Sequence, residues 1–424
     1  MSEFKPLSDL VFNVTDKVAG KKDSAKPYVG LEHMPSGGSS LLGFGRASDS
    51  ISTNNVFRPG DTLFGKLRPQ LRKSVHVSFD GYCSTDILVL RASTGANAEF
   101  AAKIIQSEGV FAQAIRTEEG TKMPRTSWRA IKDVPVLSPP LPQQRKIARI
   151  LTTVDNLIEK TEALIAKYQA IKQGMMHDLF TRGVDEHGHL RPPYEQAPEL
   201  YKQSELGWIP KEWEAQKLGE ALRIAGGYLQ TGPFGSQLHS YEYVTEGIPV
   251  VMPQDITGGR IFTDQIARIT KSKADSMARH RLRLNDVVFS RRGDLSRAAA
   301  ISPIEDGWIC GTGCFLLRCA PDRLDANWIA RQYAMPHVQR QVDANAVGST
   351  MPSLNNAVME RLLMLIPSPP EQAEIGRRIV ALESVHENLR SELHKSSLTK
   401  TGLMQDLLTG KVRVNVDEAE EVVP

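Results

Sequence analysis

Two clusters of basic residues are the part of this sequence that points most directly to a chemistry. Residues 58–73 hold five basic side chains and one acid, and residues 268–297 hold nine basic side chains and three acids. The whole chain carries a net charge of only +3. Local positive charge on a nearly neutral chain is typical of a surface that contacts nucleic-acid phosphates. The predicted DNA-contacting cations are Lys66, Arg68, Arg72, Lys73, Arg279, Arg281, Arg291, Arg292 and Arg297.

Amide side chains near these clusters are candidates for reading bases. Glutamine can form two hydrogen bonds with adenine in the major groove, as arginine can with guanine. Gln70, Gln230 and Gln237 are therefore predicted to contact DNA. For any single residue the simpler interpretation is a solvated surface group. The presence of two clusters in one chain favours DNA binding.

Motifs for catalysis are missing from the sequence. A phosphate-binding loop needs Ser or Thr after Gly-Lys, but Gly20-Lys21, Gly65-Lys66 and Gly410-Lys411 are each followed by another residue type. A common nuclease core needs an acid before Asp/Glu-x-Lys, and Glu3-Phe4-Lys5 has none. Arg191-Pro192-Pro193-Tyr194 resembles an amino-methyltransferase motif, yet arginine replaces the residue that grips the amine. We predict no catalytic residue.

Metal binding is also not predicted. Cys310, Cys314 and Cys319 follow one another at intervals of four and five residues, which are not zinc-finger spacings. Buried, reduced thiols are the preferred interpretation. His187 and His189 lie near Asp185 in a segment rich in turn-forming residues, which explains them better than a metal cluster does.

The length and composition are those of a globular protein with two or three domains. No run of about 18 apolar residues is present, so no membrane span is expected. The first residues lack the apolar stretch of a secretory signal. A cytoplasmic location is expected.

A long segment of the chain occurs twice, 228 residues apart and without a gap. Twelve identities in forty positions imply two similar units related by a pseudo-twofold. Upstream, Gly120, Met123 and Pro124 recur in the same register. The identical positions of the first copy are Pro142, Gln144, Ile147, Arg149, Glu159, Lys167, Lys172, Gly174, Met176, Asp178, Leu179 and Thr181.

Both copies are predicted to be long helices, over 142–183 and 370–410. Their apolar residues follow a heptad pattern, so the two helices are expected to bury their seams against each other. The globular module between the two copies favours an antiparallel pair within the chain. The alternative is that each helix packs on its own domain or on a partner. Lys172 and Lys400 occupy seam positions, where they could fix the register or mark an opening. The predicted seam is Ile147, Leu151, Val154, Ile158, Ile165, Ile375, Ile379, Leu382, Leu389 and Leu393.

The regions before the helices are predicted to be mixed α/β modules: a first module over 1–141 and a second over 205–369. Short β-branched runs separated by Gly, Pro, Asn and Asp support this prediction. The modules also resemble each other, as in Asp61-Thr62-Leu63-Phe64 and Asp286-Val287-Val288-Phe289. A linker over 184–204 and an acidic tail over 411–424 complete an α+β fold.

These residues give the chain a resemblance to the specificity subunits of type I restriction-modification enzymes. Leu206-Gly207-Trp208-Ile209-Pro210-Lys211-Glu212-Trp213 resembles the start of a target recognition domain in that family, and Thr231-Gly232-Pro233-Phe234-Gly235-Ser236 is similar to the loop that follows. Each module closes with Met-Pro and then a Pro-x-Gln motif, which is Pro142-Gln143-Gln144 in the first copy and Pro370-Glu371-Gln372 in the second. The first module lacks the Gly-Trp-Ile-Pro start.

The resemblance implies two target recognition domains held by two antiparallel helices. Each domain would read one half of a bipartite, asymmetric sequence in double-stranded DNA. The helices would set the spacer and dock two methyltransferase subunits, and restriction/translocase subunits would join these. S-adenosylmethionine, ATP and Mg²⁺ would then bind to the partners, and this chain would need no cofactor. The alternatives are a self-contained duplicated-domain DNA methyltransferase or nuclease, and a coiled-coil scaffold that binds no DNA.

Overall fold

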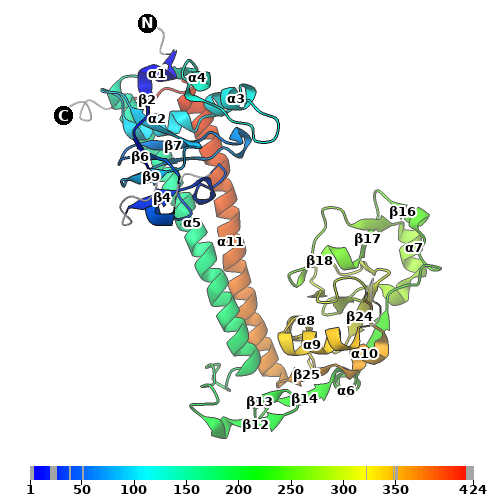
Figure 1. The fold of residues 1–424 in the computed structure, drawn as a ribbon. Helices are drawn as coiled ribbons and strands as arrows, with labels where there is room; N and C mark the ends of the chain where they lie inside the picture. The colour runs from blue at the N-terminus through cyan, green and yellow to red at the C-terminus, as the bar shows by residue number, and fades with distance from the viewer. Residues whose placement is uncertain are drawn as a thin grey trace. The chain divides into compact units, whose positions relative to one another are not determined.

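The computed structural model describes residues 4–19, 26–37, 40–49, 52–320, 322–346, 348 and 352–416. The chain divides into two compact units, Met1–Ala166 with Asn388–Pro424, and Lys167–Glu387. Each unit contains one module, the beginning of one long helix and the end of the other (Figure 1). The predicted α+β class is confirmed.

The first module is built on an antiparallel four-stranded sheet with helices on one side. Alternate residues of its strand β10 enter two cores: Leu88 and Leu90 enter one, Ile87 and Val89 the other. This explains why the strand is apolar at successive positions rather than alternating. The strands in sheet order are β2 (Val11–Val14), β10 (Ile87–Ala92), β7 (Thr62–Gly65) and β8 (Ser74–His76).

The remaining elements of the first module form a second sheet, a strand pair and short helices. The second sheet contains β3 (Lys17–Val18), β6 (Asn54–Phe57), β9 (Gly81–Cys83), β4 (Pro27–Val29) and β5 (Gly45–Arg46). The strand pair is β1 (Phe4–Pro6) with β11 (Pro135–Leu137). The helices are α1 (Leu7–Leu10), α2 (Ala98–Ile105), α3 (Glu108–Arg116) and α4 (Trp128–Ile131), with 3-10 turns η1 (Leu31–His33), η2 (Ala47–Asp49) and η3 (Pro69–Leu71).

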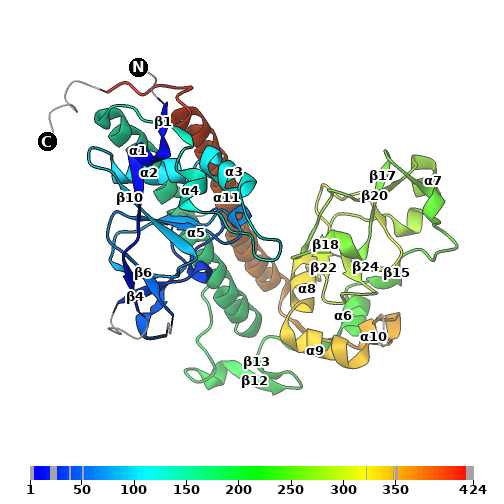
Figure 2. The ribbon, with the colours of Figure 1, turned by 45° about the horizontal axis from the view of Figure 1, so that its top comes forward.

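The second module repeats this plan. Its four-stranded sheet has the same antiparallel order, and its strand β24 also feeds two cores, with Phe315 and Leu317 on one side and Cys314 and Leu316 on the other. Helix α8 (Ala326–Tyr333) packs on this sheet (Figure 2). The strands in order are β15 (Tyr228–Thr231), β24 (Cys314–Arg318), β21 (Val287–Ser290) and β22 (Ala298–Ala300).

The other elements of the second unit form further small sheets and short helices. The strands are β16 (Tyr243–Val244), β20 (Ala267–Ile269), β17 (Ile248–Val251), β23 (Ile309–Cys310), β18 (Ile256–Thr257), β19 (Arg260–Ile261), β14 (Glu214–Lys217), β25 (Leu363–Ile366), β12 (Tyr201–Ser204) and β13 (Gly207–Pro210). The helices are α6 (Leu218–Ile224), α7 (Lys271–Ser276), α9 (Pro336–Asn345) and α10 (Asn356–Arg361), with η4 (Pro198–Leu200), η5 (Ser240–Glu242), η6 (Pro253–Asp255) and η7 (Ala278–His280).

A buried ion pair occurs at the same place in both sheets. Asp61, just before β7, accepts two hydrogen bonds from the Arg91 guanidinium at 2.6 and 2.8 Å. Asp286, just before β21, accepts two from Arg318 at 2.8 and 2.5 Å. Each carboxylate also accepts the backbone N–H three residues earlier. The sequence similarity of the two modules therefore reflects a shared structural core.

The two long helices run antiparallel. They are α5 (Leu141–Thr181) and α11 (Pro369–Leu408), and they lie side by side in Figure 1. In the first unit Asp155 of α5 contacts Lys400 of α11, and in the second unit Lys172 of α5 contacts Glu383 of α11. Because α11 numbers fall as α5 numbers rise, the helices point in opposite directions. The predicted antiparallel pair is confirmed.

The ends of these helices are part of the module cores. Four of the predicted seam residues, Ile147, Leu151, Ile375 and Ile379, are buried in these cores. The other six are half-buried: Val154, Ile158, Ile165, Leu382, Leu389 and Leu393. Packing on a domain and pairing with the other helix therefore apply to different parts of the same helix. The far end of the opposite helix completes each core, through Leu407 and Leu408 in the first and Leu179 and Phe180 in the second.

The repeated Pro-x-Gln motif joins each long helix to its module. Gln144 accepts the N–H of Asn97 at 2.9 Å and donates to the carbonyl of Pro139 at 2.8 Å. Gln372 accepts the N–H of Asp325 at 2.8 Å and donates to Pro367 at 2.8 Å. Asn97 and Asp325 are the N-caps of α2 and α8. The glutamine thus connects two helix starts through one side chain.

The segment predicted as a linker is anchored in the second unit at its start. Arg191 is buried and donates to Glu371 of α11 at 2.6 and 3.3 Å. Gly183 has a φ of +63°, and a Cβ there would lie 2.1 Å from the Glu371 carboxylate. The turn therefore requires glycine. The prediction of a linker over 184–204 did not include this ion pair.

Some predicted features lie outside the described residues. They include Met351 and the acidic positions Asp417, Glu418, Glu420 and Glu421. Within the described part of the chain, none of the helices is both long and apolar enough to cross a bilayer.

The buried ion pair of the second module predicts a large stability effect. Asp286→Ala leaves the Arg318 guanidinium largely buried without its carboxylate, and breaking such a pair costs about 3 kcal/mol. Glu214→Ala breaks the exposed pair with Lys202 and should cost less than about 1 kcal/mol. Hydrogen exchange of the amides in β21 and β24 measures both losses. Equal losses in the two variants would contradict the assignment.

Candidate nucleic-acid interface

In each module several of the predicted DNA-contacting residues lie on a loop that follows the equivalent strand of the four-stranded sheet. The first basic loop, 66–73, joins β7 to β8, and the second basic loop, 291–297, joins β21 to β22. Gly65 pairs with Ile87 and Ser290 pairs with Cys314, so both loops leave the sheet beside the start of its second strand. The two loops are therefore structurally equivalent.

Both basic loops are anchored by the segment around the Met-Pro motif. The N–H of Arg68 donates to the carbonyl of Pro124 at 2.8 Å, and the N–H of Gly293 donates to the carbonyl of Pro352 at 3.1 Å. An isolated β-bridge lies next to each of these bonds. The two prolines are 228 residues apart, so the upstream part of the repeat holds the basic loops in place.

The first residue of each basic loop is a half-buried cation. Burial lowers the pKa of the Lys66 ammonium group, although nearby Asp86 acts in the opposite direction. Burial lowers the pKa of Arg291, and the positive charge of the adjacent Arg292 lowers it further. Among the described residues neither side chain has a hydrogen-bond or ion-pair partner, and Nε of Arg291 is buried. Such a cation gains stability when an anion approaches it.

Three of the predicted cations are exposed. Arg68, Arg279 and Arg292 form no side-chain ion pair or hydrogen bond in the part of the chain that the structure describes. Arg68 also has a left-handed backbone with a φ of 50°. An arginine rarely adopts this conformation, and it is found at functional loops. These side chains are available to phosphates or bases.

Two predicted cations of the first module have partners within the protein. Arg72 donates to Glu108 at 2.5 and 2.8 Å, and this carboxylate raises the pKa of the guanidinium. Lys73 donates to the carbonyl of Leu31 at 2.7 Å. Gln70, which is exposed, donates to Glu118 at 3.2 Å. The Lys73 ammonium is therefore held by a hydrogen bond within the module, unlike the exposed cations.

Two arginines of the second module are held in the same way. Arg281 donates to the carbonyl of Gly307 at 2.8 Å and to Asp275 at 2.5 Å. Nε of Arg297 donates to Asp294 at 2.9 Å, and Nη1 lies 3.1–3.2 Å from three backbone carbonyls of residues 253–256. These hydrogen bonds hold neighbouring loops together. They give Arg281 and Arg297 a structural role that does not require DNA.

The two predicted amide readers of the second module lie on β15 and on the loop that follows it. Gln230 donates to the backbone carbonyl of Arg279 at 2.5 Å. Gln237 accepts the N–H of Phe234 at 3.0 Å, which closes the loop 232–237. The N–H of Gly232 donates to the carbonyl of Cys314, and Cys314 also pairs with Ser290. This loop and the second basic loop therefore leave the sheet at the same end of its strands. The exposed Phe234 in this loop is a candidate contact that the search for charged and amide readers did not select.

The described residues contain no group of three or more His, Cys, Asp or Glu arranged to hold a metal ion. Cys83, Cys310 and Cys314 are buried, and Cys319 is half-buried. Burial raises the pKa of Cys310 to about 12 and that of Cys319 to about 11. These thiols stay protonated at neutral pH and are poor ligands and nucleophiles.

The unpaired arginines predict a salt-dependent effect on DNA binding. Arg68→Ala and Arg292→Ala should each weaken binding about fivefold and reduce the slope of log K against log salt by about one, as loss of a phosphate contact does. Arg223→Ala, an exposed arginine on α6, is the matched control. Titrations of a labelled duplex at several salt concentrations measure the slope. An unchanged slope in both variants would remove these loops from the interface.

Comparison with known proteins finds similarity to one kind of protein. Residues 73–169 match the family described as type I restriction modification DNA specificity domain. The MjaVIII type I restriction enzyme specificity subunit of Methanocaldococcus jannaschii is 24% identical over 302 residues, which cover 70% of this chain and 66% of that protein. The putative MjaX specificity subunit of the same organism is 27% identical over 292 residues, which cover 67% and 60%. The matches thus span less than two thirds of these relatives.

A solved structure has the same fold. The S subunit of a type I restriction-modification system from M. genitalium aligns with a TM-score of 0.60 and 15% identity, covering 96% of this chain and 95% of that one. The resemblance predicted from the duplicated helices and the module motifs is confirmed: the chain is similar to the specificity subunits of type I restriction-modification enzymes.

Proposed function

We propose that the chain binds a bipartite, asymmetric DNA sequence and that each module reads one half-site. The observation that carries this proposal is the pair of equivalent basic loops, each anchored by the proline of a Met-Pro motif and each beginning with a half-buried cation that has no partner among the described residues. Phosphate contacts from these cations would place each module, and base contacts from neighbouring side chains would specify the sequence.

The differences between the two loops favour two different half-sites. The first loop begins Lys66-Leu67-Arg68, and the second begins Arg291-Arg292-Gly293. The backbone bonds that hold them are the same, while the side chains that they present differ. A shared scaffold with different exposed groups would read two sequences in one geometry.

Partner subunits would dock along the long helices. We infer two methyltransferase subunits, with restriction/translocase subunits bound through them, and we place S-adenosylmethionine, ATP and Mg²⁺ in those subunits. Exposed apolar side chains on the helices support a docking role, because such residues mark protein contacts. They include Leu157 and Leu164 in the first unit, and Val380 and Val385 in the second.

Exchange of one module tests the assignment of half-sites. Replacing residues 205–369 by the second module of another specificity subunit should change one half of the methylated sequence and leave the other half intact. Base-resolution mapping of methyladenine in cells that carry the complete system measures both halves. A change in both halves would contradict modular reading. Binding of S-adenosylmethionine by the purified chain alone would favour the self-contained methyltransferase instead.

The length of the helices is proposed to set the spacer between the half-sites. The helices contain 41 and 40 residues, and each is continuous. Insertion of seven residues into both preserves the heptad seam and adds about 10 Å of helix. The spacer in the methylated sequence should then lengthen by up to about three base pairs, at roughly 3.4 Å each. An unchanged spacer would contradict this role.

A further inference from the structure

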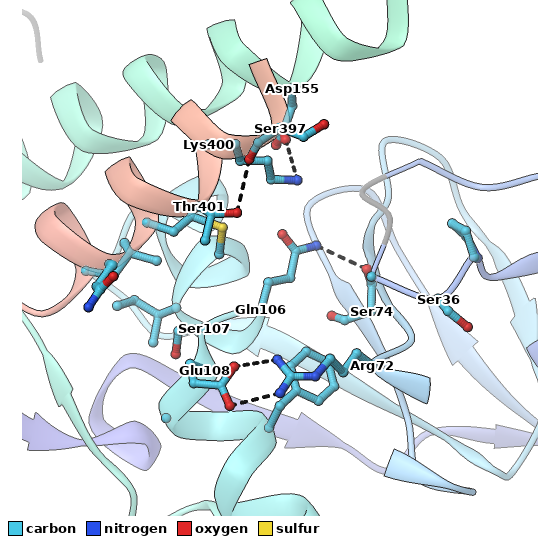
Figure 3. Close-up of a pocket in the computed structure, with 18 of the residues that line it drawn as sticks. Ser36, Arg72, Ser74, Gln106, Ser107, Glu108, Asp155, Ser397, Lys400 and Thr401 are labelled. Atoms are coloured by element: carbon cyan, nitrogen blue, oxygen red, sulfur yellow. Dashed lines mark hydrogen bonds and ion pairs between the residues drawn. The ribbon is translucent and has the colours of Figure 1, made fainter. Parts of the chain in front are cut away.

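A buried carboxylate on α5 joins three elements of the first unit. The Asp155 side chain is 8% exposed. It forms ion pairs with Lys103 of α2 and with Lys400 of α11, the latter at 2.7 Å (Figure 3). One acid therefore links the module to both long helices.

A carboxylate on α11 does the same in the second unit. Glu383, whose side chain is 11% exposed, accepts hydrogen bonds from Arg331 of α8 at 3.0 and 2.9 Å. It also accepts one from Lys172 of α5 at 2.9 Å. The cation of the module and the cation of the opposite helix again meet at one acid.

The two junctions are related by the sequence repeat. Asp155 and Glu383 are 228 residues apart, and so are Lys103 and Arg331, and Lys172 and Lys400. Only the lysines of the long helices are identical. The acids and the module cations are exchanged for residues of the same charge. A comparison of identities therefore finds one member of each junction and misses the other two.

The ion pairs keep both carboxylates charged. Burial alone would raise the pKa of Asp155, but Lys103 and Lys400 together outweigh it, and the pKa lies below its usual value. Burial acts in the same way on Glu383, and Arg331 and Lys172 outweigh it. A carboxyl with a depressed pKa stabilises the fold above its ordinary pKa, and this contribution is lost as the pH falls through the lowered value.

We propose that Asp155 and Glu383 are positioning residues. Each fixes its module to the helix pair and so holds the basic loop of that module in the rotational phase along the DNA that the spacer requires. This inference rests on the proposed function. The junction is a second attachment point for the module helix, because Gln144 and Gln372 already hold the other end of α2 and α8. Two attachment points along one helix restrict its rotation, whereas one does not.

A cavity of about 1270 Å³ explains why the first module needs this attachment. It lies between the module and both long helices, and Asp155 and Lys400 are part of its lining (Figure 3). The apolar contacts of the module with the helices include Ile147 and Leu407 at the helix ends, which do not line the cavity. Beside the cavity, close packing cannot set the orientation of the module, so a directional ion pair has more influence there.

The experiment removes the link to the module and leaves the helix pair intact. Lys103→Met and Arg331→Met break the module side of each junction, while each acid keeps its lysine on the opposite helix. The assembled methyltransferase complex is titrated with duplexes that carry the mapped bipartite sequence, with the native spacer or one base pair more or less. Each variant should lower the preference for the native spacer at least threefold.

The controls separate positioning from loss of folding or of DNA binding. Arg260→Met breaks an exposed ion pair between the second module and Glu387 of α11, and Glu159→Gln changes the equivalent exposed position on α5; both should leave the preference within twofold. Lys103→Arg and Arg331→Lys exchange the two cations and should keep the preference. Thermal unfolding establishes that each variant is folded.

The outcomes are distinguishable. An unchanged spacer preference in folded Lys103→Met and Arg331→Met overturns the positioning role and leaves the proposed function intact. An equal loss in the control variants overturns it as well. If the native complex prefers no bipartite duplex over random DNA, the proposed function fails, and the positioning role fails with it.

Discussion

The structure depends on how each module is attached to a pair of antiparallel helices. Apolar residues at the helix ends enter the module cores, a glutamine joins two helix starts, and a buried carboxylate binds one cation from the module and one from the opposite helix. A buried acid that loses a partner is costly, by about 3 to 5 kcal/mol. These contacts therefore strongly favour one register of the helices and one orientation of each module on them.

The same constraint explains which parts of the sequence repeat and which diverge. Residues at the attachment must satisfy the same contacts in both units, so Gln144 and Gln372, and Lys172 and Lys400, are identical. The basic loops are held by backbone hydrogen bonds, which do not restrict side chains. Each loop can change the groups that it presents without disturbing its anchor. This separation suits a protein with one framework and two different recognition surfaces.

Much of this could be predicted from the sequence because repetition and heptad spacing are visible in one chain. The helices, the two modules and the basic clusters followed from them. The ion pairs and hydrogen bonds of the charged side chains did not, because they join residues distant in the chain: Arg72 with Glu108, Arg297 with the carbonyl of Gln254, and Asp155 with Lys400. A count of charges cannot separate such residues from Arg68 and Arg292, which have no ion-pair partner among the described residues. Arg191 was missed for the same reason, since its partner Glu371 is 180 residues away.

The most direct measurement is a base-resolution map of methylated adenine in cells that carry this chain with its partner subunits. We expect one asymmetric sequence made of two specific halves with a non-specific spacer of fixed length. A continuous or palindromic sequence, or halves separated by a spacer of variable length, would contradict this expectation.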